Sequence, residues 1–279
     1  MPTAATPPAV VVGVDGSDGA LGAARWAAAL AATEGRPLTL LHARSRLERP
    51  DADGDAVLAA AAEAVRSEHP DLEVGAEAAR GSVAAVLAEG SRAARLLVVG
   101  TDSHRALGGH AVRVLHRAQC PVALWRAPVA KRTGKPLPVV VGVDDSAASA
   151  HALAEAFALA CAWHAPLTVA HMWEIDAAVG MGDLGGQGNM DWPLLTVLET
   201  QQRRRVEEMV APLTKKYPNA HVSTVFEDTS PARGLTDLSR EAQLVIVGSH
   251  GHGRLAEAIL GSVSQNLAHH AECPVLLVR

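Results

Sequence analysis

The chain contains the same unit twice, and this repeat constrains the fold more than any other feature. The run Val10–Asp15 reappears 129 residues later, unchanged, as Val139–Asp144. A second match joins Leu97–Gly100 to Val245–Gly248, and the matches keep the same order in both halves. Because a tandem repeat folds as copies of one unit, the 279 residues are predicted to form two similar domains.

Each copy alternates strand and helix patterns. The first apolar run ends at Asp15, as is typical of a strand that is buried on both faces. Five strands that alternate with four helices in each copy predict an α/β fold with two tandem, doubly wound, parallel five-stranded sheets of Rossmann-like type. The predicted strands cover residues 9–14, 37–42, 72–79, 95–100, 122–125, 138–143, 167–171, 221–226, 244–248 and 275–278, and the predicted helices cover 19–33, 55–68, 83–92, a segment ending near 118, 147–163, 194–216, 232–240 and 262–270.

The first domain is predicted to span residues 1–127 and the second residues 137–279. The linker, residues 127–138, overlaps the ends of both domains and has prolines at positions 128, 136 and 138 with lysine and arginine between them. This composition is typical of a solvated, semi-rigid spacer.

The overall composition argues against several classes of protein. A net charge of -5 and an aromatic content of 3% do not suit a protein that binds nucleic acid, which needs basic and stacking side chains. The Ala-rich stretch at residues 153–163 is too short to span a membrane, and residues 1–9 lack the pattern of a signal peptide. With only three widely spaced cysteines, the expected compartment is the cytoplasm.

A glycine-rich loop follows the fourth strand of the second copy. It has the spacing Gly-x2-Gly-x9-Gly-Ser, with glycines at Gly248, Gly251 and Gly261, and Ser262 begins a predicted helix. Glycines let the backbone approach a ligand closely, and the amides at a helix N-terminus attract phosphate. A simple turn after the strand is the alternative, but the position and spacing of the loop favour an anion-binding site.

These motifs together resemble the universal stress protein family, in its tandem two-domain form. The resemblance rests on Val140–Asp144, the pair His171–Met172, and the glycine-rich loop, which matches the ATP-binding signature of the family. It implies an adenine nucleotide alpha hydrolase-like fold that binds ATP. A Mg²⁺ ion carried on the phosphates is expected in preference to a metal held by protein ligands. Asp144 and Met172 would then border the adenine, and the loop would hold ribose and phosphates. The implied binding residues are Gly142, Val143, Asp144, Met172, Val247, Gly248, Ser249, His250, Gly251, Gly261, Ser262, Val263 and Ser264. For Asp144 the alternative role is helix capping, which Ser146 can fill instead.

The first copy departs from this signature. Ser103 stands where the second glycine belongs, the loop is five residues shorter, and Asp102 places a negative charge where phosphate would lie. Like charges at about 4 Å repel by several kcal/mol near a protein surface. Asp15 is retained, but we expect a degenerate site that binds nucleotide weakly or not at all.

Other features of the sequence give weaker indications of function. His250, His252, His269 and His270 do not complete a four-ligand metal set, so no protein-ligated metal is predicted. Cys120 and Cys273 each precede a proline at equivalent positions, which suggests packing and not catalysis. The glycine-rich insertion at residues 176–193 is either a lid over the pocket or a connector.

Three classes of function follow from the sequence. The first is a regulatory nucleotide-binding protein, and the second is a slow ATP hydrolase or nucleotidyl-transfer enzyme on the same fold. The third is an interaction module without nucleotide. The sequence contains no P-loop and no supported nucleophile arrangement, so efficient catalysis is not expected.

The last strand of each copy, at 122–125 and 275–278, is apolar and is expected at a sheet edge, which favours association. In the resembled family this edge pairs two domains. The two copies are therefore expected to pair within the chain as a pseudo-dimer, and any homodimer would use other surfaces.

Overall fold

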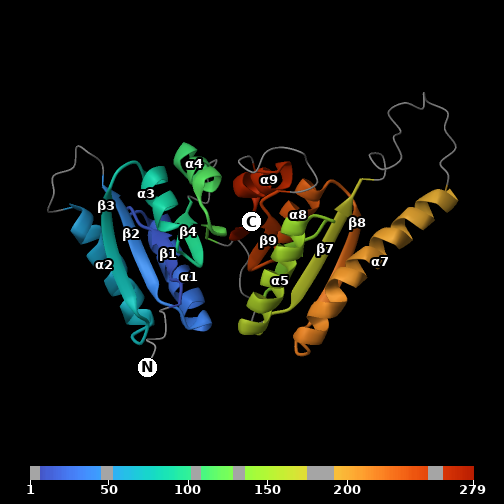
Figure 1. Ribbon diagram of the computed structural model, residues 1–279, viewed down its shortest axis with the longest axis horizontal. Helices are drawn as coiled ribbons and strands as arrows, with labels where there is room; N and C mark the ends of the chain where they lie inside the picture. The colour runs from blue at the N-terminus through green and yellow to red at the C-terminus, as the bar shows by residue number, and fades with distance from the viewer. Residues whose placement is uncertain (1–6, 45–52, 102–107, 128–135, 175–191, 251–259) are drawn as a thin grey trace.

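The computed structural model describes residues 7–44, 53–101, 108–127, 136–174, 192–250 and 260–279. Its strands form one continuous ten-stranded sheet in the order β3-β2-β1-β4-β5-β10-β9-β6-β7-β8, with helices on both faces (Figure 1). The first half of the chain supplies β1 to β5 and the second half supplies β6 to β10. The α/β fold is confirmed, but the two predicted sheets are joined into one.

The elements agree closely with those predicted, and no boundary moves by more than two residues. The first half contains β1 (Val10–Gly13), α1 (Asp18–Glu34), β2 (Leu38–Arg44), α2 (Asp53–Glu68), β3 (Val74–Arg80), α3 (Val83–Gly90), β4 (Leu96–Gly100), α4 (Gly109–Arg117) and β5 (Val122–Trp125). The second half contains β6 (Val139–Gly142), α5 (Ala147–Ala162), β7 (Leu167–Trp173), α7 (Trp192–Lys216), β8 (Val222–Asp228), α8 (Pro231–Ser239), β9 (Leu244–Gly248), α9 (Ser262–His270) and β10 (Val275–Val278).

The two halves meet through their last strands. β10 runs antiparallel to β5, with Val275 opposite Leu124 and Leu277 opposite Val122. All other strand pairs of the sheet are parallel. The expected pairing of the two copies within one chain is therefore confirmed, because each apolar edge is covered by the other.

The core consists of two layers, one on each face of the sheet. Alternate residues of a strand point to opposite faces, so Val10 and Val12 of β1 enter one layer and Val11 the other. Buried residues of α1, α2, α5 and α7 belong to the first layer, and those of α3, α4, α8 and α9 belong to the second. Both layers continue across the junction of the two halves, so the halves share one hydrophobic interior.

Serine hydroxyls cap the first helix of each half. Ser17 Oγ accepts a hydrogen bond from the amide of Ala20, and Ser146 Oγ accepts one from the amide of Ser149. No helix in the described part of the chain is long and apolar enough to cross a membrane.

Candidate functional site

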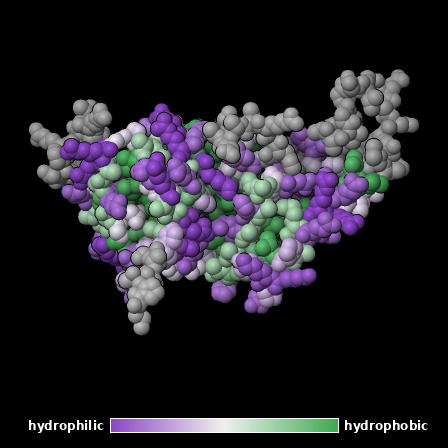
Figure 2. Space-filling view, viewed as in Figure 1, coloured by the Kyte–Doolittle hydropathy of each residue, from purple (hydrophilic) through white to green (hydrophobic). Residues whose placement is uncertain are grey.

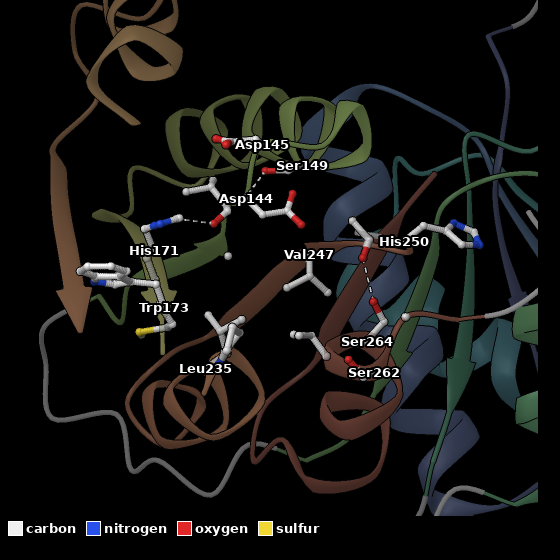
Figure 3. Close-up of a pocket in the computed structure, with 18 of the residues that line it drawn as sticks. Asp144, Asp145, Ser149, His171, Trp173, Leu235, Val247, His250, Ser262 and Ser264 are labelled. Carbon is white, nitrogen blue, oxygen red and sulfur yellow. Dashed lines mark hydrogen bonds between the residues drawn. The ribbon is translucent and has the colours of Figure 1, made fainter. Parts of the chain in front are cut away.

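A pocket opens at the carboxyl ends of β6 and β9 in the second half. β6 lies between β9 and β7, so the strand order reverses there, which is where parallel α/β sheets bind ligands. The pocket has a volume of about 660 Å³, within the usual range for small-molecule sites (Figure 3). Eleven of the thirteen predicted binding residues line it: Gly142, Val143, Asp144, Met172, Val247, Gly248, His250, Gly261, Ser262, Val263 and Ser264.

Two predicted residues do not line this pocket. Ser249 is buried, and its backbone donates to Val278 O at 2.6 Å and accepts from the Gly261 amide at 2.9 Å. Ser249 therefore ties the start of α9 to the end of β10. Gly251 lies outside the described residues.

Asp144 lies on the α5 side of the pocket and is held by a local turn. Its Oδ1 accepts hydrogen bonds from the amide and the hydroxyl of Ser146, at 2.9 and 2.5 Å. Its backbone amide donates to Ser149 Oγ at 2.9 Å. Because Ser146 caps the helix, Asp144 is not needed for capping, and its Oδ2 makes no hydrogen bond within the described residues. This carboxylate oxygen is free to accept from a ligand.

His171 joins the ends of β6 and β7 beneath the pocket. Its Nδ1 lies 2.9 Å from Val143 O, and since a carbonyl oxygen only accepts, Nδ1–H donates in this contact. The ring is 7% exposed, and Nε2 has no partner in the described part of the chain. His42 makes the same contact with Val14 O, at 2.7 Å, in the first half. The shared geometry indicates that this histidine fixes the strand ends in both halves.

The opposite end of the pocket is the N-terminus of α9. Gly261 is the N-cap residue and offers no side chain to the exposed amides of the first turn. Ser264 Oγ donates to Gly248 O at 2.7 Å, as the dashed line in Figure 3 shows. In this structure the Ser264 hydroxyl holds α9 against β9, and its predicted contact with a ligand stays a prediction. The helix amides and the Ser262 hydroxyl are the groups that remain for an anion.

The charges of the pocket are unevenly placed. No lysine or arginine occurs among its described lining residues, whereas Asp144 and Asp145 both lie at the α5 side. Arg205 of α7 pairs with Asp145 at 2.7 Å, and this offsets one of the two negative charges. An anionic group would therefore be stabilised at the α9 end by backbone dipoles rather than by basic side chains.

Several lining residues were not identified from the sequence. Pro231 and Leu235 come from α8, Gln202 from α7, and Trp173 from the end of β7. Met172 packs over Gly234 of α8, where an added Cβ would lie 2.9 Å from its sulfur. Gly234 lets α8 approach β7 closely at Met172. A glycine within a predicted helix does not by itself show which strand the helix approaches, so the contact is evident only once the fold is known.

The first half has a smaller pocket at the equivalent place. Its volume is about 430 Å³, and its lining includes Asp15, His42, Gly100 and Gly108. Asp102 and Ser103, on which the expected loss of nucleotide binding depends, lie outside the described residues. The degeneracy of this site stays a prediction.

The remaining candidates were the histidines and the cysteines, and of these His252 lies outside the described residues. The described residues contain no cluster of three or more potential metal ligands. Burial raises the pKa of Cys120 to about 11 and that of Cys273 to about 12, so both thiols stay protonated at neutral pH. Most of the insertion at 176–193 lies outside the described residues.

Comparison with known proteins gives one consistent result. The sequence model of the Universal stress protein family matches residues 8–126 and again residues 137–279. A universal stress protein of Mycolicibacterium smegmatis is 31% identical over 100% of this chain and 99% of its own length. Universal stress protein Rv2623 of Mycobacterium tuberculosis is 32% identical, with 97% and 96% covered. The crystal structure of a universal stress protein from Archaeoglobus fulgidus has a TM-score of 0.68 at 18% identity and covers 98% of this chain and 97% of its own.

Proposed function

This chain belongs to the universal stress protein family with two family domains in tandem, and we propose that it is a regulatory protein that binds ATP in its second domain. The proposed binding domain comprises residues 137–279. Residues 1–127 form the other domain, whose nucleotide site is degenerate. This domain contributes mainly to the hydrophobic interior that both halves share.

The observation that carries the proposal is the polarity of the pocket. A free carboxylate oxygen of Asp144 lies on one side, and the uncapped N-terminus of α9 at Gly261 lies on the other. A carboxylate can accept a hydrogen bond from the amino group of adenine, and helix amides can donate to phosphate oxygens. Between them the walls are apolar, with Met172, Leu235 and Val247 positioned to pack on a flat base.

Magnesium fits this site as a companion of the ligand. The pocket has no described basic side chain, so a divalent cation on the phosphates would supply the missing positive charge. Ser262 begins α9 and lines the pocket, so its hydroxyl lies at the end where the phosphates and their cation would bind.

Binding is better supported than catalysis. The described residues at the α9 end are Leu260, Gly261, Ser262, Val263 and Ser264, and they include no carboxylate or cysteine to act on a terminal phosphate. His250 also lines the pocket, but its Nδ1 lies 2.8 Å from Ser249 Oγ. In Figure 3 its ring points away from the space between Asp144 and Ser262. A slow ATP hydrolase on this fold is the second candidate, and it requires groups outside this set.

Two measurements test the proposal. Mass spectrometry of freshly purified, denatured protein should release an adenine nucleotide, and calorimetry with ATP and Mg²⁺ should give one site per chain. Protein that contains no nucleotide and takes up none would contradict the proposal. Two equal sites would contradict the degeneracy of the first half, and steady phosphate release that depends on Gly261 would favour the hydrolase.

A further inference from the structure

An arginine from the first half caps the C-terminal end of a helix of the second half. Arg126 follows β5 directly and is only 5% exposed. Its Nη1 donates to Ala271 O and its Nη2 to Ala268 O, each at 2.6 Å. These carbonyls belong to the last turn and the C-cap of α9, where the backbone has no intrahelical donors to satisfy it.

An arginine of the second half makes the equivalent contact with a helix of the first half. Arg279 follows β10, 153 residues after Arg126, and its Nη2 donates to Leu115 O at 2.5 Å. Leu115 is in the last turn of α4, and Ala268 is the residue 153 positions later in α9. Each arginine thus caps the helix of the opposite half, on either side of the β5–β10 junction.

The guanidinium of Arg126 has few other means of stabilisation. Burial lowers its pKa, and no ion pair with a carboxylate is found for it within the described residues. Its charge is therefore matched by the partial negative charge at the C-terminus of α9, an interaction that is strengthened in partly buried geometries.

The other end of α9 is the anion-binding end of the pocket. The helix has nine residues and is therefore roughly 14 Å long. A phosphate at its N-terminus and a cation at its C-terminus both favour the same ordered, fully formed helix. Two groups that stabilise one state of a shared element strengthen each other by linkage.

We propose that Arg126 is a positioning residue for the nucleotide site of the second half, because it holds the C-terminal end of the helix whose N-terminus receives the phosphates. The inference rests on the proposed function and adds its regulation. Phosphate binding in the second half is coupled to the contact between the halves, and α9 carries the coupling. The first-half pocket is coupled in the same way only to Arg279, through α4.

The test compares two arginines that share the interface but not the helix. Arg126→Met removes the charge and keeps the apolar stem, Arg279→Met does the same at α4, and Arg126→Lys keeps a cation at α9. Calorimetry with ATP and, separately, with adenosine gives the gain in affinity due to the phosphates for each variant. A general loosening of the interface would act alike in both Met variants, and local damage to the pocket would weaken both ligands.

Arg126→Met is expected to weaken ATP binding roughly three- to tenfold and adenosine binding less than twofold. Arg279→Met should leave both affinities unchanged, and Arg126→Lys should recover most of the loss. Equal effects of the two Met variants on ATP, or equal effects of Arg126→Met on ATP and adenosine, would overturn the inference. Wild-type protein that binds neither ligand would refute the proposed function itself.

Hydrogen exchange on the unmodified protein provides a second test that does not depend on a variant folding. ATP, but not adenosine, should slow exchange at the last amides of α9, at residues 267–271. Exchange there that is indifferent to ATP, in protein shown to bind it, would also overturn the coupling.

Discussion

Trp26 of α1 and Trp163 at the C-terminal end of α5 meet edge to face between the two halves, with ring centroids 6.2 Å apart and ring planes at 79°. A second contact joins the same two halves, because Arg95 pairs with Glu34 of its own half at 3.0 Å and also with Glu155 of the other half. Burial opposes the charge of Arg95, but the two carboxylates outweigh it and raise its pKa. The contact between the halves therefore extends from the paired strands to the helices beneath them.

Leu277→Lys is expected to loosen this junction. Leu277 is 2% exposed and lies opposite Val122, so a lysine there would bury an unpaired charge, at a cost of several kcal/mol. Hydrogen exchange should become faster at both β5 and β10, while amides of β1 and β6 stay protected. Val197→Lys is the control, because Val197 is 52% exposed. Unchanged exchange at both terminal strands would show that their pairing does not hold the halves together.

Gly261→Asp is expected to abolish ATP binding. A side chain and a negative charge would enter the space in front of the exposed α9 amides and would cap them in place of phosphate. Gly108→Asp changes the equivalent N-cap residue of α4 and should leave the affinity of the second-half site unchanged. Calorimetry measures both, and wild-type affinity in the Gly261 variant would remove this helix end from the site.

Asp144→Asn should weaken ATP binding about fivefold, because a neutral acceptor replaces a charged one at a bond whose charge adds about 1 kcal/mol. The amide oxygen of asparagine can still accept from Ser146, so the turn before α5 should survive. Asp15→Asn is the matched change in the first half and should have no effect. If the Asp144 variant bound ATP and GTP in the same ratio as wild type, Asp144 would not contact the base.

The buried thiols give a prediction about pH. A raised pKa means that Cys120 and Cys273 favour the folded state while protonated. Their contribution is complete below about pH 9 and is lost as the pH rises toward 11 and 12. At pH 8, iodoacetamide should modify Cys161, which is partly exposed, well before the other two. All three should react alike in urea, and rapid native labelling of Cys120 or Cys273 would show that burial does not protect them.

The repeat and its periodicities were sufficient to predict the elements of the fold. Runs such as Val139–Gly142 are apolar on both faces, and Ser17 and Ser146 precede their helices, so local sequence determines these strands and helix starts. The pairing of β5 with β10 followed from two short apolar edges and the resemblance to a family. The contacts by which Arg126 and Arg279 each cap a helix of the opposite half could not be predicted, because no local pattern shows which helix an arginine after a strand will reach.

The residues of the candidate site likewise include some that the sequence predicts and some that it does not. Residues that directly follow strands, such as Asp144 and Gly248, were identified because parallel strands bring their carboxyl ends together. Leu235 and Gln202 were missed because they reach the pocket from helices, whose approach depends on packing across the whole face. The hydrogen bond of the Ser264 hydroxyl to Gly248 O was not predicted, because only the coordinates show that this backbone carbonyl lies within reach.

The position of the outermost strands has a consequence for solubility. β3 and β8 form the two ends of the sheet, and most of their residues are exposed, including Glu77 and Arg80 on one and Glu227 and Asp228 on the other. In Figure 2 hydrophilic residues, in purple, occur toward both outer ends of the molecule, with hydrophobic residues, in green, among them. Charged edges resist the addition of further strands. The charged outer strands therefore disfavour growth of the sheet into filaments by the addition of further copies of the chain.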